Sequence, residues 1–138
     1  MVTVSRNTIR ANSWKNTFDA IKAGTTSEVS NRVYAAFPLD TITLPLIIIE
    51  NTAITGHEKV LTGEADSKIT HLVTIYTKKA SEIDSIADKV DATLRATSGT
   101  FATSGQYLID ITDNGTVEFE NINDQRNFSK TLTVQFQV

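Results

Sequence analysis

Two histidines, His57 and His71, are the side chains of this sequence best suited to bind a metal or carry a proton. A metal site made from them would need a third ligand, and nothing in their spacing supplies one. His71 stands in an alternating segment and is interpreted as a sheet residue with satisfied hydrogen bonds. His57 is interpreted as a solvated residue of a long polar segment. The chain has no cysteine, which excludes disulfides and thiolate metal sites.

An acidic cluster, Asp110, Asp113, Asn114 and Glu118, is the second candidate for metal chemistry. Its spacing does not match the calcium loop of an EF-hand. The triplet Asp113-Asn114-Gly115 is instead typical of a type I′ turn, because Asn and Gly accept positive φ at both central positions. We therefore predict a hairpin turn here and no metal site.

Other catalytic patterns are missing from the sequence. No glycine-rich phosphate loop occurs, and no serine lies in a G-x-S-x-G motif. The basic pair Lys78 and Lys79 is interpreted as a solvated turn, and Trp14 as a core residue. The prediction is a protein that is not an enzyme and needs no cofactor.

The clearest elements that would carry these residues are a strand and a helix in succession. Residues 69–76 alternate with period two, which indicates a strand. A stripe at helical spacing then predicts a helix from Ser81 to Ala96, with Ser81 as N-cap and Gly99 as C′ residue. The stripe consists of Ile83, Ile86, Ala87, Val90 and Leu94. Such a helix must cover a sheet.

The remaining elements complete an α+β fold in a single domain, 1–138. A first helix is predicted from a cap at Ser13, with Trp14, Phe18 and Ile21 inward and Gly24 at its end. Residues 1–12 are expected to form a loose arm or an edge strand. Further strands are predicted at Ile42–Glu50, at 107–111 with Tyr107, Ile109 and Ile111 on one face, at 117–119 and at 131–138. Asn121–Asn127 is predicted to be a loop. The expected architecture is a mostly antiparallel sheet packed against one or two helices, with a protruding loop or hairpin.

The protruding part is residues 51–67, a long polar segment that nevertheless contains Ile54, Val60 and Leu61. A solvated connector has no reason to carry these side chains, and long loops in compact domains are often functional. The predicted assembly interface is therefore Ile54, His57, Val60 and Leu61. The alternative is a locally folded hairpin that covers its own core.

Charge and hydropathy indicate the partners and the cellular compartment to expect for this protein. The net charge of −3 is mild and no basic run predicts specific binding of nucleic acid. The longest apolar run, residues 46–49, is far shorter than the ~20 residues of a membrane span. No apolar signal core is present near the start of the sequence. These features indicate a soluble protein that is used or assembled in the cytoplasm.

The order of elements resembles the tail-terminator or tail-completion proteins of long-tailed bacteriophages. The resemblance covers about residues 30–138. It rests on FPLDTITLPLIIIE with its proline-bounded strand ending in Glu50, on the polar excursion, on ITHLVTIYTKKASEIDSIADKVDATL and on the closing segments YLIDI and TLTVQFQV. The polar residues ahead of Trp14 depart from the family, whose members often begin directly with a helix.

The resemblance implies a structural virion protein that forms a ring, usually a hexamer, at the head-proximal end of the tail. Such a ring sits on the tail tube protein, stops tube polymerisation and offers a surface to the head connector or stopper protein. DNA would pass through the ring without specific binding, and assembly would take place in the host cytoplasm.

Other classes of protein fit the same pattern. One is another neck or tail component, such as a stopper or a tube subunit. The other is a small-ligand-binding or enzymatic α+β domain, because many folds of this outline bind ligands. Ring-shaped assemblies favour the virion classes, and a monomer with a deep pocket favours the last.

Overall fold

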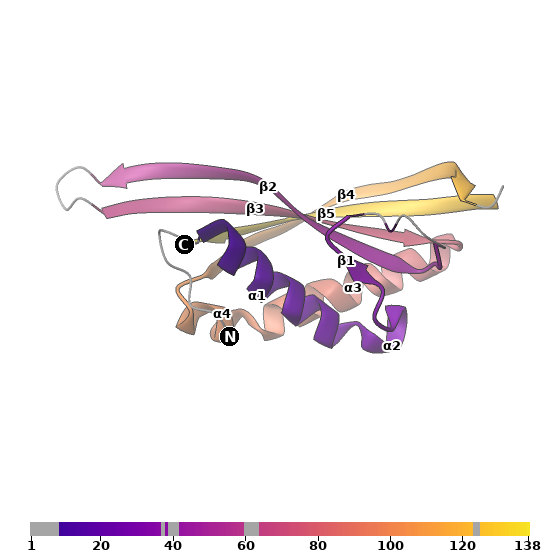
Figure 1. Ribbon diagram of the computed structural model, residues 1–138, viewed down its shortest axis with the longest axis horizontal. Helices are drawn as coiled ribbons and strands as arrows, with labels where there is room; N and C mark the ends of the chain where they lie inside the picture. The colour runs from indigo at the N-terminus through magenta and orange to yellow at the C-terminus, as the bar shows by residue number, and fades with distance from the viewer. Residues whose placement is uncertain (1–8, 37, 39–41, 60–63, 123–124) are drawn as a thin grey trace.

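A long antiparallel sheet forms one layer of the molecule in the computed structural model (Figure 1). The structure describes residues 9–36, 38, 42–59, 64–122 and 125–138, and the side chains of 10–36, 38, 42–50, 68–118 and 127–138. In these residues, five strands lie in the order β1-β2-β3-β5-β4. All neighbours are antiparallel except β1, which is parallel to β2. The strands are β1 (Val33–Tyr34), β2 (Leu46–Lys59), β3 (Glu64–Thr77), β4 (Tyr107–Ile122) and β5 (Gln125–Gln137).

The helices lie together on one face of this sheet (Figure 1). The long helix α3 packs on β3 and β5, and α1 lies beside it over β2. The helices are α1 (Ile9–Gly24), α2 (Thr26–Val29), α3 (Ala80–Ala96) and α4 (Ser98–Thr103). The predicted α+β class, with a mostly antiparallel sheet under helices, is confirmed.

The main core lies between the helices and the sheet. The predicted stripe of α3 is confirmed, because all five of its members are buried: Ile83, Ile86, Ala87, Val90 and Leu94. They meet the inward residues of the central strands, such as Val73 and Ile75 of β3 and Val134 of β5. Gly24 allows α1 to approach α3 closely, since a Cβ built there would lie 2.3 Å from Thr93 Cγ2.

A second, smaller apolar cluster lies on the opposite face of the sheet. Leu46 and Ile48 of β2 are buried there with Leu44, while Tyr34, Ile42 and Tyr76 pack around them in part. The continuous apolar run 46–49 is thus explained, because β2 is covered on both faces at this point.

The segment around Asp113 corrects one prediction. Residues 107–122 form a single strand, and Asp113-Asn114-Gly115 is a bulge rather than a hairpin turn. Gly115 has φ +87°, and its N–H donates to Asp113 Oδ1 at 2.7 Å. The triplet therefore uses its turn-forming geometry to insert extra residues into a continuing ladder. The predicted loop 121–127 is also wrong, because β4 continues to Ile122 and β5 begins at Gln125.

Three predicted helix boundaries are also wrong. α1 includes Ile9–Asn12, so Ser13 lies inside the helix and not at its cap. α3 begins at Ala80, after an N-cap residue, Lys79, that makes no side-chain capping bond. Gly99 lies in α4, which follows α3 directly after Thr97. The end of α1 at Gly24 is confirmed.

Buried polar groups join α1 to β3 and to Gln106, the residue directly before β4. Ser13 Oγ lies 2.9 Å from Nε2 of the fully buried His71 on β3. One turn farther along α1, Asn16 Nδ2 donates to Gln106 Oε1, and Gln106 Nε2 donates to Thr17 Oγ1, both at 3.2 Å. These bonds fix the rotation of α1 over the strands, because a rotated helix would leave buried polar groups without hydrogen-bond partners.

The strands are much longer than the helices that cover them. At about 3.3 Å per residue, the 14 residues of β3 span about 46 Å. The 17 residues of α3, at about 1.5 Å per residue, span only about 25 Å. In consequence the β2–β3 hairpin extends past the helical layer at one end, and the β4–β5 pair extends past it at the other (Figure 1).

The buried His71 predicts how stability depends on pH. Burial lowers the pKa of His71 from 6.5 to about 4. The folded protein therefore binds this proton less readily than the unfolded chain does. The contribution of neutral His71 to the free energy of unfolding is therefore fully present above about pH 6.5. It declines by about 3 kcal/mol as the pH falls to about 4.

Urea unfolding of the wild type and of His71→Gln between pH 4 and 8 checks this prediction. Glutamine keeps a polar group for Ser13 but does not titrate. The difference in unfolding free energy between the two proteins should be constant above pH 7 and should shift against the wild type below pH 6. A difference that stays constant down to pH 4 would show that His71 is not buried as described.

Candidate functional site

The two histidines lie in different surroundings. His71 is enclosed by the core, and its ring meets Phe136 edge-on at a centroid distance of 5.8 Å. Its Nδ1 has no hydrogen-bond partner among the described residues, so the sequence-based interpretation of a fully satisfied histidine is only half right. His57 belongs to the extended end of β2, where its backbone pairs with Asp66. In the part of the chain that the structure describes, no group of three or more His, Asp or Glu residues is arranged to hold a metal ion.

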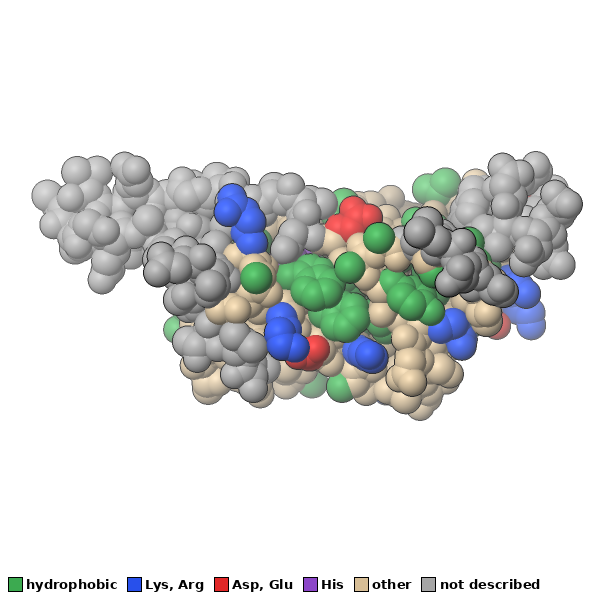
Figure 2. All heavy atoms as spheres, viewed as in Figure 1, with side chains coloured by type: hydrophobic (Ala, Val, Ile, Leu, Met, Phe, Trp, Pro, Cys, Tyr) green, Lys and Arg blue, Asp and Glu red, His purple; other side chains and the backbone are tan. Residues whose placement is uncertain are grey.

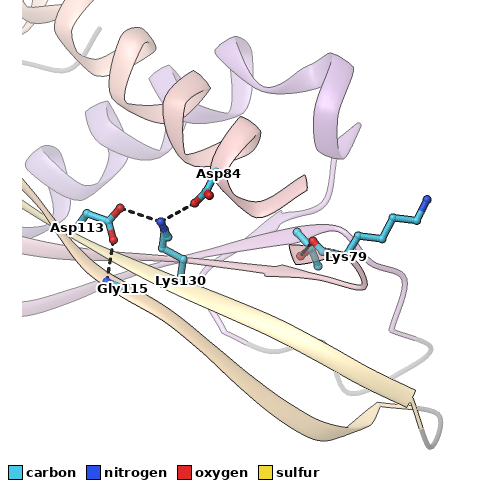
Figure 3. A network of polar contacts seen from close by, with 6 residues as sticks. Lys79, Asp84, Asp113, Gly115 and Lys130 are labelled. Carbon is cyan, nitrogen blue, oxygen red and sulfur yellow. Dashed lines mark hydrogen bonds and ion pairs between the residues drawn. The ribbon is translucent and has the colours of Figure 1, made fainter. Parts of the chain in front are cut away.

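A network of charges surrounds Lys130, on the core-facing side of β5 (Figure 3). Its Nζ donates to Asp84 Oδ1 of α3 at 2.7 Å and to Asp113 Oδ2 of the β4 bulge at 2.8 Å. Only 9% of the Lys130 side chain is exposed, whereas Asp84 and Asp113 are half or more exposed. The network thus joins the helical layer to the edge strand through one ammonium group.

The electrostatics of this network favour structure over reactivity. The hydrogen bond to Asp113, followed by the one to Asp84, raises the pKa of Lys130. The bond from Lys130, followed by the Gly115 N–H, lowers the pKa of Asp113. Lys130 therefore stays protonated and is a poor nucleophile or base. The predicted solvated turn is confirmed, because Lys78 and Lys79 are exposed and Lys79 points away from the network (Figure 3).

A shallow hollow lies where α1 meets the edge of β2. It has a volume of about 470 Å³ and is lined by Trp14, Ala35, Ile49 and Glu50. Trp14 stacks on Phe18 at a centroid distance of 4.7 Å, and its Nε1 donates to the Ile49 carbonyl at 2.8 Å. Trp14 was predicted to be core; it packs against the core but is only partly buried. Figure 2 shows this face, where hydrophobic side chains gather at the centre with Lys and Arg side chains beside them.

Two of the four predicted assembly residues, Ile54 and His57, lie in described parts of the β2–β3 hairpin. The structure places Ile54 and His57 on β2, with their backbones opposite Ile69 and Asp66 of β3. Val60 and Leu61 lie outside the described residues. Segment 51–67 was predicted to be a protruding loop or a hairpin, and the hairpin is the form observed, since β2 pairs with β3 from Leu46 to Lys59. The role of these residues in assembly stays a prediction.

The exposed edge of β4 is a feature that sequence reasoning missed. Tyr107, Ile109 and Val117 are exposed at 56%, 44% and 59%. The alternation of Tyr107, Ile109 and Ile111 had predicted one shared face. A register shift between Leu108 and Asp110 places Leu108 and Ile111 toward the core instead. Nothing local in the sequence marks this bulge.

Replacing Lys130 tests the network. Lys130→Met keeps most of the volume but removes the bonds to both carboxylates, and a hydrogen bond to a charged group is worth about 1.5–3 kcal/mol. Because both carboxylates are well solvated, we expect a loss of about 1–2 kcal/mol in unfolding free energy near pH 7. Chemical denaturation measures this loss.

The matched control is Lys89→Met, at an exposed position of α3, which should change stability little. Raising the pH through the elevated pKa of Lys130 should remove the difference between wild type and Lys130→Met. Equal losses in the two variants would mean that the network does not hold the bulge.

The chain has a structural likeness among solved proteins. No family model and no curated protein sequence matches the chain. Among solved structures, a chain of the virion of a native gene transfer agent particle is similar over 90% of this chain and 91% of its own length. The identity is 11% and the TM-score 0.45. In the described residues, no helix is long and apolar enough to cross a membrane.

Proposed function

We propose that this protein is a structural protein of a phage virion. Several copies form a ring, a hexamer in the family that the sequence resembles. The ring caps the head-proximal end of the tail tube, ends tube polymerisation and offers a surface for joining to the head connector. The observation that carries the proposal is the overhang of the sheet beyond its helices.

The overhanging strands need support that the described part of the monomer does not give them. A two-stranded hairpin is marginally stable in water unless a further layer covers it. The β2–β3 hairpin continues to Lys59 and Glu64, well past the helical layer (Figure 1). A neighbouring copy or a tube subunit that packs on this hairpin would supply the missing layer.

The order of elements supports the same class. The described fold contains the succession on which the resemblance rests: a strand through Glu50, a hairpin, the strand β3, the helix α3 with its apolar stripe, and closing strands. The agreement extends to the contact between α3 and β3. It supports a scaffold whose helices cover one sheet face and leave the strand ends available for partners.

A small-ligand-binding protein is the alternative from another class. Its candidate site would be the hollow beside Trp14. Ligand sites normally enclose most of the ligand surface. This hollow is open to solvent and is lined by few side chains, so the geometry favours the assembly function.

Electron microscopy of tail tubes tests the proposal. The purified protein is added to tail-tube protein of the same phage during polymerisation. We expect tubes of limited length with a ring of added density at one end. The variant Ile54→Ser/Val60→Ser/Leu61→Ser should keep its circular dichroism spectrum but lose capping, because the predicted interface loses its apolar contacts.

Ala92→Ser/Ala96→Ser, at exposed positions of α3, is the matched control and should cap like the wild type. Tubes that grow to the same length without a terminal ring in the presence of the wild-type protein would contradict the proposed function. If the triple variant unfolds, the hairpin belongs to the monomer core and the assembly role of these residues is wrong.

A further inference from the structure

Both edges of the sheet lack a partner strand over long stretches among the residues that the structure describes. At one edge, β4 pairs only with β5 among the described strands. At the other edge, β1 covers β2 only at Ile47 and Ile48. Beyond this point the Ile49 carbonyl accepts from Trp14, and no described strand lies beside the rest of β2. Open edges of this length are templates for pairing with another chain.

The polarity of the strands makes the two edges complementary. β2, β3, β5 and β4 alternate in direction across the sheet, so β4 is antiparallel to β2. If one copy follows another with the same orientation, β4 of the first meets β2 of the second as an antiparallel pair. That is the more stable kind of ladder. The helices of both copies would then lie on the same side of a continued sheet.

The charges of β4 disfavour its pairing with a second β4. β4 carries acidic residues and no basic ones: Asp110, Asp113, Glu118 and Glu120. β2 from Glu50 outward carries Glu50, Glu58 and Lys59. The segments from α1 to β1 carry more basic than acidic residues: Arg10, Lys15, Lys22 and Arg32 against Asp19 and Glu28. A contact between two β4 strands would therefore bring more like charges together than a contact between β4 and β2.

Large apolar side chains are exposed on β4. Among the described side chains of this strand they are Tyr107, Ile109 and Val117. Tyr107 and Val117 lie opposite Gln137 and Ser129, on the sheet face away from the helices. A strand of a second copy paired with β4 would bring side chains beside them and reduce their contact with water.

We propose that the partner of each edge is a second copy of this chain. β4 of one copy pairs with β2 of the next from Glu50 outward, and the sheet continues from copy to copy. This is a head-to-tail contact, which produces a closed ring when the rotation between copies closes. The inference rests on the proposed function for its closure into a ring, while the strand pairing itself requires no tail tube.

Cysteine cross-linking tests the pairing directly, because the natural chain contains no cysteine. Glu50 and Thr112 are exposed at opposite ends of one cross-strand row, which runs through Leu72 and Thr133. A Glu50→Cys chain is mixed with a Thr112→Cys chain and treated with a short bismaleimide. The flanking variants Asp110→Cys and Val117→Cys replace Thr112→Cys in parallel mixtures to allow for a different register.

The expected product is a covalent dimer, at about twice the 15.1 kDa of one chain, in at least one mixture. Each single variant alone should remain monomeric under denaturing electrophoresis, since a head-to-tail contact never places two identical positions together. A chain carrying both cysteines should give a ladder that ends at the size of the ring. Glu50→Cys mixed with Asp88→Cys, at an exposed position of α3, is the control and should not cross-link.

Two results would overturn the pairing. One is a symmetric dimer from a single variant, which requires a two-fold contact. The other is the absence of any mixed product up to the solubility limit of the protein. The cross-linking result is independent of the tube experiment. A cross-linked ladder without capping of tubes would support the strand pairing and contradict the proposed function. Capping of tubes without mixed dimers would support the proposed function and contradict the strand pairing.

Discussion

The difference in length between strands and helices is the constraint on which the rest of the structure depends. A residue advances the chain about twice as far in a strand as in a helix. Strands of 14 residues therefore cannot be covered along their whole length by helices of 16 or 17 residues. The molecule accordingly has a covered centre, which forms the core, and strand ends that extend beyond it (Figure 1).

The covered centre is built to be rigid. The apolar stripe of α3 packs on the middle of β3 and β5, and Gly24 lets α1 pack closely on α3. His71 with Ser13, and Gln106 with Asn16 and Thr17, give α1 one orientation. Lys130 then ties α3 to the bulge of the edge strand. A rigid centre of this kind can hold projecting strand ends in a fixed direction, which an assembly subunit requires.

The parts of the fold that depend on local periodicity could be predicted from the sequence. The stripe of α3, the alternation of β3 and β5, and the α+β class follow from side-chain spacing alone. The parts that failed depend on distant partners. Asp113-Asn114-Gly115 has the composition of a turn, but it forms a bulge in which Asp113 binds Lys130, 17 residues away. Ser13 has the chemistry of a cap, yet its partner is His71, 58 residues away. Of the candidate site, the sequence indicated the hairpin through Ile54 and His57 but not the edge of β4, because the register shift after Leu108 has no local signature.

Amide hydrogen exchange measured residue by residue tests most directly whether the ends of β2 and β3 are stabilised only by contact with a neighbouring subunit. The comparison is between a dilute sample, in which the chain is monomeric, and a concentrated, assembled one. The account predicts that amides of residues 53–59 and 64–68 exchange much faster than those of 70–76 in the monomer, and that assembly slows the former while the latter change little. Strand ends that are already as protected as the centre in the monomer would contradict it, because the hairpin would then need no neighbour.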